Sequence, residues 1–158
     1  MESFLGNIYC WFETFFGQYL AEHLWGFDGE EYSLSNIYNT IGLLAIVISL
    51  CFVVFYYYIL NHPRLSRWWA WSIVLVINGI VNLFVGYAWT VSDYLNGNIA
   101  DSLMFARNEE GQIVSELIKK SDCWGFGIAN FFVATILYII FSFCLKWWST
   151  NCKHSPCL

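Results

Sequence analysis

Three long apolar stretches dominate the pattern of hydrophobic and polar positions along the chain. Residues 37–60, 68–91 and 124–145 contain no charged side chain. At about 1.5 Å per residue, a helix of this length crosses the ~30 Å hydrocarbon core of a bilayer. The stretches lack the alternation of apolar and polar residues that marks the strands of a membrane barrel. The pattern therefore predicts three transmembrane helices, over residues 37–60, 68–91 and 124–148.

The connections between these stretches set the expected topology. Residues 61–67 form a short turn that contains Pro63, so the first two helices should form an antiparallel hairpin. A longer loop, residues 92–123, joins the second helix to the third, and a short tail, residues 149–158, follows. Three crossings place residues 1–36 and the long loop on one side of the membrane and the turn and the tail on the other.

Charge is divided unequally between these two sides. All twelve acidic residues fall on the side of the N-terminal segment and the long loop. The opposite side carries basic residues and no acidic one: Arg64, Arg67, Lys146 and Lys153. Lys and Arg favour the cytoplasmic side of a membrane. We therefore expect the N-terminus outside and the C-terminus in the cytoplasm, in a plasma membrane or bacterial inner membrane.

The N-terminal segment is apolar, but Glu2, Glu13 and Glu22 disfavour a fourth span. Its apolar residues recur every three or four positions: Phe4, Ile8, Phe12, Phe15, Tyr19 and Leu20. The polar residues Asn7, Glu13, Gln18 and Glu22 occupy the opposite face. This periodicity predicts an amphipathic helix that lies in the outer membrane interface and ends at Gly26.

The long loop allows two structures. Ile113, Val114, Leu117 and Ile118 follow helical spacing, which predicts a short amphipathic helix from about residue 112 to 120. Residues 108–111, Asn-Glu-Glu-Gly, also form a turn signal between two short strands, 103–107 and 112–115, so a β-hairpin is the alternative. In either case we expect the loop to pack with the N-terminal helix as a structured outer cap.

The composition agrees with a membrane protein. Hydrophobic residues make up 58% of the chain and charged residues 12%, whereas a soluble domain carries about 25% charge. The net charge is −5, and no basic stripe is present to neutralise phosphates, so nucleic acid is not an expected partner. The expected fold class is an all-α polytopic membrane protein, with residues 1–158 as a single membrane domain.

No sequence motif indicates an enzyme or a cofactor. The His-Glu-x-x-His, Gly-x-Ser-x-Gly, phosphate-loop and Rossmann patterns are all missing, and the apolar stretches 37–60, 68–91 and 124–145 contain no Asp, Glu, Lys, Arg or His. We therefore expect no catalytic residue and no cofactor. The tail offers Cys152, His154 and Cys157, one ligand short of a structural zinc site, so no metal is expected. Cys10 and Cys123, both expected outside, are a candidate disulfide.

Each span carries a seam of small and polar residues. The small residues are candidates for close helix packing: Gly42, Ala45, Gly86, Gly127 and Ala134. The polar ones are Ser49, Asn78, Asn82 and Asn130. A buried Asn seeks a hydrogen-bond partner on another helix, which favours a packing role. In a ring of several copies, the same four polar residues would instead line a water-filled pore.

Two functions fit this pattern. The first is a homo-oligomeric pore that conducts ions or permeabilises the membrane, with the acidic outer cap concentrating cations at its mouth. Because three helices enclose only a narrow gap, it requires self-association. The alternative is a non-conducting accessory, immunity or anchoring subunit, which recruits a protein partner at the outer cap or at the basic inner surface. In both cases the lipid bilayer is the first partner.

Overall fold

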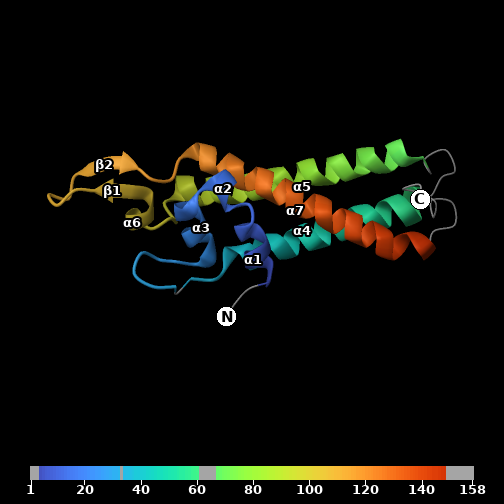
Figure 1. The fold of residues 1–158 in the computed structure, drawn as a ribbon, viewed down its shortest axis with the longest axis horizontal. Coiled ribbons are helices and arrows are strands. Elements are labelled where there is room, and N and C mark those ends of the chain that lie inside the picture. Colours follow the sequence, from blue (N-terminus) through green and yellow to red (C-terminus); the bar gives the residue numbers. More distant parts are fainter. Residues whose placement is uncertain (1–3, 33, 61–66, 149–158) are drawn as a thin grey trace. The chain divides into compact units, whose positions relative to one another are not determined.

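Three long helices make up most of the computed structural model, which describes residues 4–32, 34–60 and 67–148 (Figure 1). Helix α4 (Ile37–Val54) continues as a π-helical segment, Phe55–Leu60. Helix α5 spans Trp68–Asn96, and α7 spans Lys120–Leu145 and ends in a 3-10 turn, Lys146–Trp148. All three helices are long and apolar enough to cross a membrane, as the sequence predicts.

Local polar groups and a glycine set several helix ends, and α5 and α7 extend beyond the apolar stretches. Asn36 Oδ1 accepts the backbone N–H of Asn39 at 3.2 Å and caps the start of α4. Asp122 Oδ2 accepts the backbone N–H of Lys119 at 2.8 Å, which places the start of α7 before residue 124. Helix α5 continues past residue 91 until Gly97, whose φ of +70° ends it.

The predicted turn and tail lie largely outside the described residues. Residues 61–66, with Pro63 and Arg64, are not described, nor are residues 149–158 with Lys153. The candidate ligand group of the tail, Cys152, His154 and Cys157, therefore has no structural counterpart here.

The N-terminal segment forms three short helices, where the sequence predicts a single one. They are α1 (Phe4–Cys10), α2 (Glu13–Phe16) and α3 (Gln18–Trp25). Gly17 separates α2 from α3 with φ +81° and ψ 156°, a conformation that only glycine adopts readily. Helix α3 ends at Gly26, as predicted, because Gly26 takes a left-handed conformation and its N–H bonds back to the carbonyl of Glu22.

The long loop contains a β-hairpin, so the predicted helix at 112–120 is wrong and the alternative is confirmed. A short helix, α6 (Asp101–Met104), leads into β1 (Phe105–Arg107), which pairs antiparallel with β2 (Ile113–Glu116). Asn108 Oδ1 accepts the backbone N–H of Gln112 at 2.8 Å, and Gly111 has φ +78°. These turn contacts outweigh the weak helical spacing of the residues that follow. The fold is therefore mostly helical with one small sheet.

The chain folds as two compact units, and each long helix contributes to both. The first unit comprises residues 1–42 and 83–130, so it contains α1–α3, α6 and the hairpin. The second unit comprises residues 43–82 and 131–158.

An aromatic cluster forms the core of the first unit. Tyr9 of α1 stacks on Tyr38 of α4 with ring centroids 5.3 Å apart, and lies 5.5 Å from Phe126 of α7. Phe16 meets Phe126 edge-on at 5.3 Å, and Trp25 meets Tyr38 edge-on at 5.4 Å. Such pairs stabilise a fold by about 0.5 to 1.5 kcal/mol each beyond the area they bury. The cluster holds the N-terminal helices against α4 and α7.

The second unit has its own buried core of aromatic and small residues. Its fully or nearly fully buried members are Val53, Tyr56, Tyr57, Ala70 and Tyr138. Beside this core, Trp71 donates its indole N–H to the hydroxyl of Ser142 at 2.8 Å, which joins α5 to α7.

Candidate functional site

The polar residues of the spans bond to one another within the chain. In the second unit, Asn78 Nδ2 on α5 donates to the backbone oxygen of Ala134 on α7 at 3.1 Å. The same amide donates to Ser49 Oγ on α4 at 3.2 Å, and this hydroxyl also points to the Ala134 oxygen at 3.4 Å. Asn78, Ser49 and Ala134 are fully buried. Asn78 therefore joins all three helices of this unit.

Asn82 extends this polar group by one helical turn. Its Nδ2 donates to the backbone oxygen of Asn78 at 2.9 Å and lies 3.3 Å from Asn78 Oδ1. Asn82 is also fully buried. Asn82 thereby orients the side chain of Asn78. Because Asn78 Oδ1 faces the Asn82 amide, Asn78 Nδ2 points toward α4 and α7 and donates there.

Asn130 belongs to the first unit and has a partner outside the spans. The Tyr9 hydroxyl donates to Asn130 Oδ1 at 2.6 Å, and both side chains are fully buried. Burial raises the pKa of the Tyr9 hydroxyl above its ordinary value, which keeps it a neutral donor. The sequence analysis missed Tyr9, because a contact over 121 residues leaves no local signal.

The small residues of the seams occupy positions where another group approaches closely. A Cβ at Gly86 would come within 3.0 Å of Asn130, and one at Gly127 within 3.0 Å of the Leu83 carbonyl. A Cβ at Gly42 would likewise come within 3.0 Å of the side chain of Leu5 in α1. Ala45 and Ala134, in the second unit, are fully buried. These positions match the close approach that small residues allow between helices.

The exposed surface of the spans is mostly apolar, and Asn39 and Thr40 near the start of α4 are its exposed polar residues. Within residues 43–60, 68–91 and 124–145, no exposed residue is Asn, Ser, Thr, Gln or charged. The four pore-lining candidates, Ser49, Asn78, Asn82 and Asn130, are all fully buried in contacts inside one chain. In this arrangement they position helices and present no polar group to a neighbouring copy.

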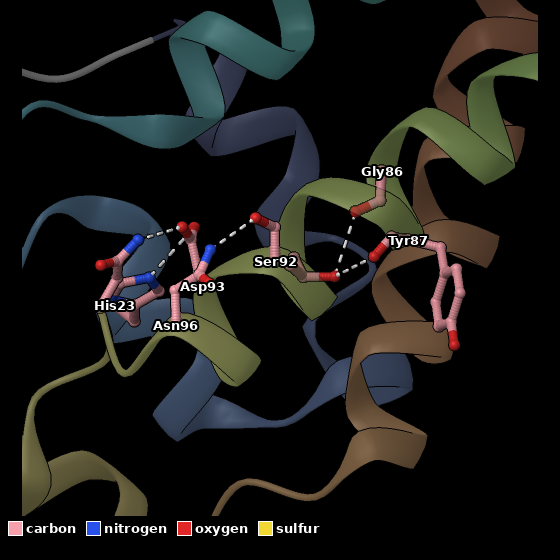
Figure 2. A network of polar contacts seen from close by, with 8 residues as sticks. His23, Gly86, Tyr87, Ser92, Asp93 and Asn96 are labelled. Atoms are coloured by element: carbon pink, nitrogen blue, oxygen red, sulfur yellow. Dashed lines mark hydrogen bonds and ion pairs between the residues drawn. The ribbon is translucent and has the colours of Figure 1, made fainter.

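A second polar network lies at the end of α5, in the first unit (Figure 2). His23 of α3 faces Asp93, with His23 Nε2 at 3.6 Å from Asp93 Oδ2. Asp93 Oδ1 also accepts from Asn98 Nδ2 at 3.1 Å. One turn earlier, the buried Thr90 hydroxyl bonds to the backbone oxygen of Gly86 at 3.1 Å. The His23–Asp93 pair ties α3 to α5.

Beside this network, Ser92 Oγ on α5 accepts from Asn96 Nδ2 at 3.1 Å. In the described part of the chain, no group of three or more His, Cys, Asp or Glu residues is placed to hold a metal ion.

The cysteines of the described residues are free thiols. Cys10 is half-buried and Cys123 fully buried in the first unit, and the structure does not form the candidate disulfide between them. Cys51 and Cys144 are exposed on the apolar surface of the spans.

The basic groups at the far end of the spans are only partly described. Lys146 is largely buried, and its Nζ lies 5.0 Å from the ring centre of Phe143 and 5.1 Å from that of Trp147. A lysine whose ammonium group contacts two aromatic rings of its own chain is less available to bind a partner. Arg67 is exposed, whereas Arg64 and Lys153 lie outside the described residues.

Comparisons of the chain with known protein families, with curated proteins and with solved structures give no match.

Proposed function

We propose that the chain is a non-conducting membrane subunit whose β-hairpin recruits a protein partner. The observation that carries this proposal is the exposure of strand β2 along its whole length. Ile113 and Val114 are 55% and 68% exposed, although they lie outside the three candidate spans. Exposed apolar side chains on a folded element away from the lipid-facing helices favour a contact with another protein.

The form of the hairpin indicates the kind of partner. In a two-stranded sheet, each strand has one edge whose backbone groups are not used by its neighbour, and such an edge accepts an added strand. The adjoining turn carries the exposed Glu109 and Glu110, and Glu116 lies in β2 itself. Arg107 is paired with Asp101, with Nη2 and Oδ2 3.2 Å apart. We therefore favour a partner that adds an extended strand with basic flanking residues.

The polar groups inside the spans support a non-conducting protein. A pore between several copies needs polar side chains on the surface that one copy presents to the next. Here Ser49, Asn78, Asn82 and Asn130 use their hydrogen-bonding groups within one chain. A pore of several copies thus has less support than recruitment.

The orientation and the location of the chain belong to the same proposal. We place the hairpin and α1–α3 outside, and the C-terminus in the cytoplasm, because all acidic residues lie on the hairpin side and Lys and Arg favour the cytoplasmic side. The N-terminal helices then lie on the outer side of a plasma membrane or bacterial inner membrane.

Site-specific photo-crosslinking in native membranes tests the proposed partner contact. A photoreactive residue at Val114 should give a discrete adduct of protein size. The matched control is Tyr32, which lies outside the spans and is 67% exposed, close to the 68% of Val114. The adduct should disappear when Ile113→Asp is added and weaken several-fold with Glu109→Lys and Glu110→Lys. No adduct at Val114, or the same adduct at Tyr32, would contradict the proposal.

A further inference from the structure

The N-terminal helices carry large apolar side chains on both of their faces. The inward face buries Tyr9, Phe16, Leu20 and Leu24 in the first unit. The outward face exposes four aromatic residues, two of them almost completely: Phe4 at 77%, Trp11 at 79%, Phe15 at 50% and Tyr19 at 44%. The core of the unit explains the inward face, and the outward face stays exposed within the described chain.

The outward face includes three of the six residues on the apolar side that the periodicity predicts. Phe4, Phe15 and Tyr19 belong to that side and are exposed, whereas Tyr9 and Phe16, which lie outside it, are fully buried. The reason is the aromatic cluster, in which Tyr9 stacks on Tyr38 and Phe16 packs edge-on against Phe126. Gly17 then breaks the helix and redirects the segment that follows.

The contacts of α1 and α2 place this segment beside residues inside the spans. Leu5 lies against Gly42, about 8 Å into the first span at 1.5 Å per residue. Tyr9 bonds to Asn130, about 9 Å beyond Trp124 along α7. A segment that touches two spans at these positions reaches past the headgroup level, because the hydrocarbon core begins near the ends of the apolar stretches.

The exposed residues of the segment carry no charge. Between residues 4 and 21 the exposed residues are aromatic residues, residues with an amide or a hydroxyl group, and one glycine. They are Phe4, Asn7, Trp11, Thr14, Phe15, Gly17, Gln18 and Tyr19. The acidic residues Glu13 and Glu22 are half-buried, and Glu22 accepts from Gln18 at 3.0 Å. A mixture of Trp, Tyr, Phe and neutral polar groups is typical of protein surfaces at the boundary between lipid and water.

The N-terminal segment also packs directly on α7. The backbone carbonyl of Phe15 lies against Gly125 of α7. The neighbouring residues of α7, Trp124 and Ile128, are themselves exposed and lie in a candidate span.

We propose that residues 4–19 form a re-entrant segment inserted into one leaflet, with Phe4, Trp11, Phe15 and Tyr19 in contact with lipid. The segment enters the bilayer beside α4 and α7 and does not cross it. Its backbone groups are tolerated at this depth because α1 and α2 are helical and one side packs on protein. The occupant of the outward face is the acyl and glycerol region of the phospholipids.

Spin-label accessibility tests the lipid contact on the full-length protein in phosphatidylcholine vesicles. The six cysteines are replaced, and single cysteines are introduced by Phe4→Cys, Trp11→Cys and Phe15→Cys. Ile128→Cys, on the exposed surface of α7, is the lipid-facing reference, and Val114→Cys, in the hairpin, is the aqueous reference. Labels at positions 4, 11 and 15 should collide with oxygen several-fold more than with a water-soluble nickel complex, as at position 128.

Two results would overturn the proposal. Nickel accessibility equal to that at position 114 would place the segment in water. Protection from both agents would mean that protein, such as a second copy, covers the face. If the cysteine-free protein does not fold, a photoreactive residue at Trp11 in the otherwise unchanged chain replaces the label. Phospholipid adducts, identified by their mass, should then form at position 11 and be absent at position 114.

Discussion

Asn78 shows what a single polar residue does inside the second unit. Its amide nitrogen reaches Ser49 on α4 and the backbone oxygen of Ala134 on α7, and its oxygens lie near the Asn82 amide. In lipid, a polar group without a partner costs several kcal/mol, so such an amide strongly favours the arrangement that satisfies it. Asn130 is satisfied in the same way by Tyr9 in the first unit.

Replacing Asn78 tests this structural role. Asn78→Leu should lower the free energy of unfolding by about 0.6 to 2 kcal/mol, because it removes the bonds to Ser49 and Ala134 and keeps an apolar side chain. The measurement is denaturation by SDS in mixed micelles, followed by circular dichroism. Ile80→Leu, at an exposed position on the same helix, is the matched control and should change the free energy little. Equal stability of the two variants would contradict the role given to Asn78.

At the residue scale, the sequence identified the groups that need partners and left the partners open. Asn in an apolar helix is visible as an anomaly, so Asn78, Asn82 and Asn130 were found. The hydrogen-bond partners that satisfy Asn78 and Asn130 depend on which helix faces meet. Tyr9 with Asn130, and His23 with Asp93, come from segments far apart in the chain, and no local pattern relates them.

At the scale of elements, apolar length was the strongest signal and turn chemistry the next. The long helices follow the apolar stretches because a backbone in lipid must satisfy its own hydrogen bonds, and this requirement is local. The hairpin was recognised only as an alternative, since four apolar residues at helical spacing competed with the Asn108 turn. The N-terminal helix was expected to be continuous, and Gly17 interrupts it.

The Gly17 break provides a test at this scale. Gly17→Ala should destabilise the first unit by about 1 to 3 kcal/mol, because φ +81° with ψ 156° is accessible almost only to glycine. No atom would lie within 4 Å of the new Cβ, so the effect would come from the backbone alone. Hydrogen exchange of α2 and α3 measures it, with the exposed Thr14→Ala as the control. Unchanged exchange in Gly17→Ala would show that this backbone geometry is not required.

At the scale of the whole molecule, polar and apolar surfaces are sorted by solvent. Apart from the exposed Asn39 and Thr40 near the start of α4, the exposed residues of the spans are apolar. Acidic residues are confined to the segments outside the apolar stretches. This distribution suits a protein that is anchored by its spans and contacts its partner outside them.

The same distribution predicts the absence of conduction. The purified chain, reconstituted in phospholipid vesicles, should pass no more potassium or sodium than protein-free vesicles, because Asn78 and Asn82 are sealed inside one chain. Flux is measured by a fluorescent ion indicator, with a known channel as the positive control. An ion flux that Asn82→Leu changes, without dispersing an oligomer, would contradict the non-conducting proposal and favour the pore.

The sequence by itself determined that the bilayer is the solvent, where the long helices lie and which of their residues require a polar partner. These properties depend on the length and period of nearby residues. Only the tertiary structure decided that the asparagines bond within one chain, that β2 is exposed, and that α1 and α2 turn Tyr9 and Phe16 inward. Each of these depends on which distant side chains fill the same space, because packing and hydrogen bonding select among faces that are equally apolar in the sequence.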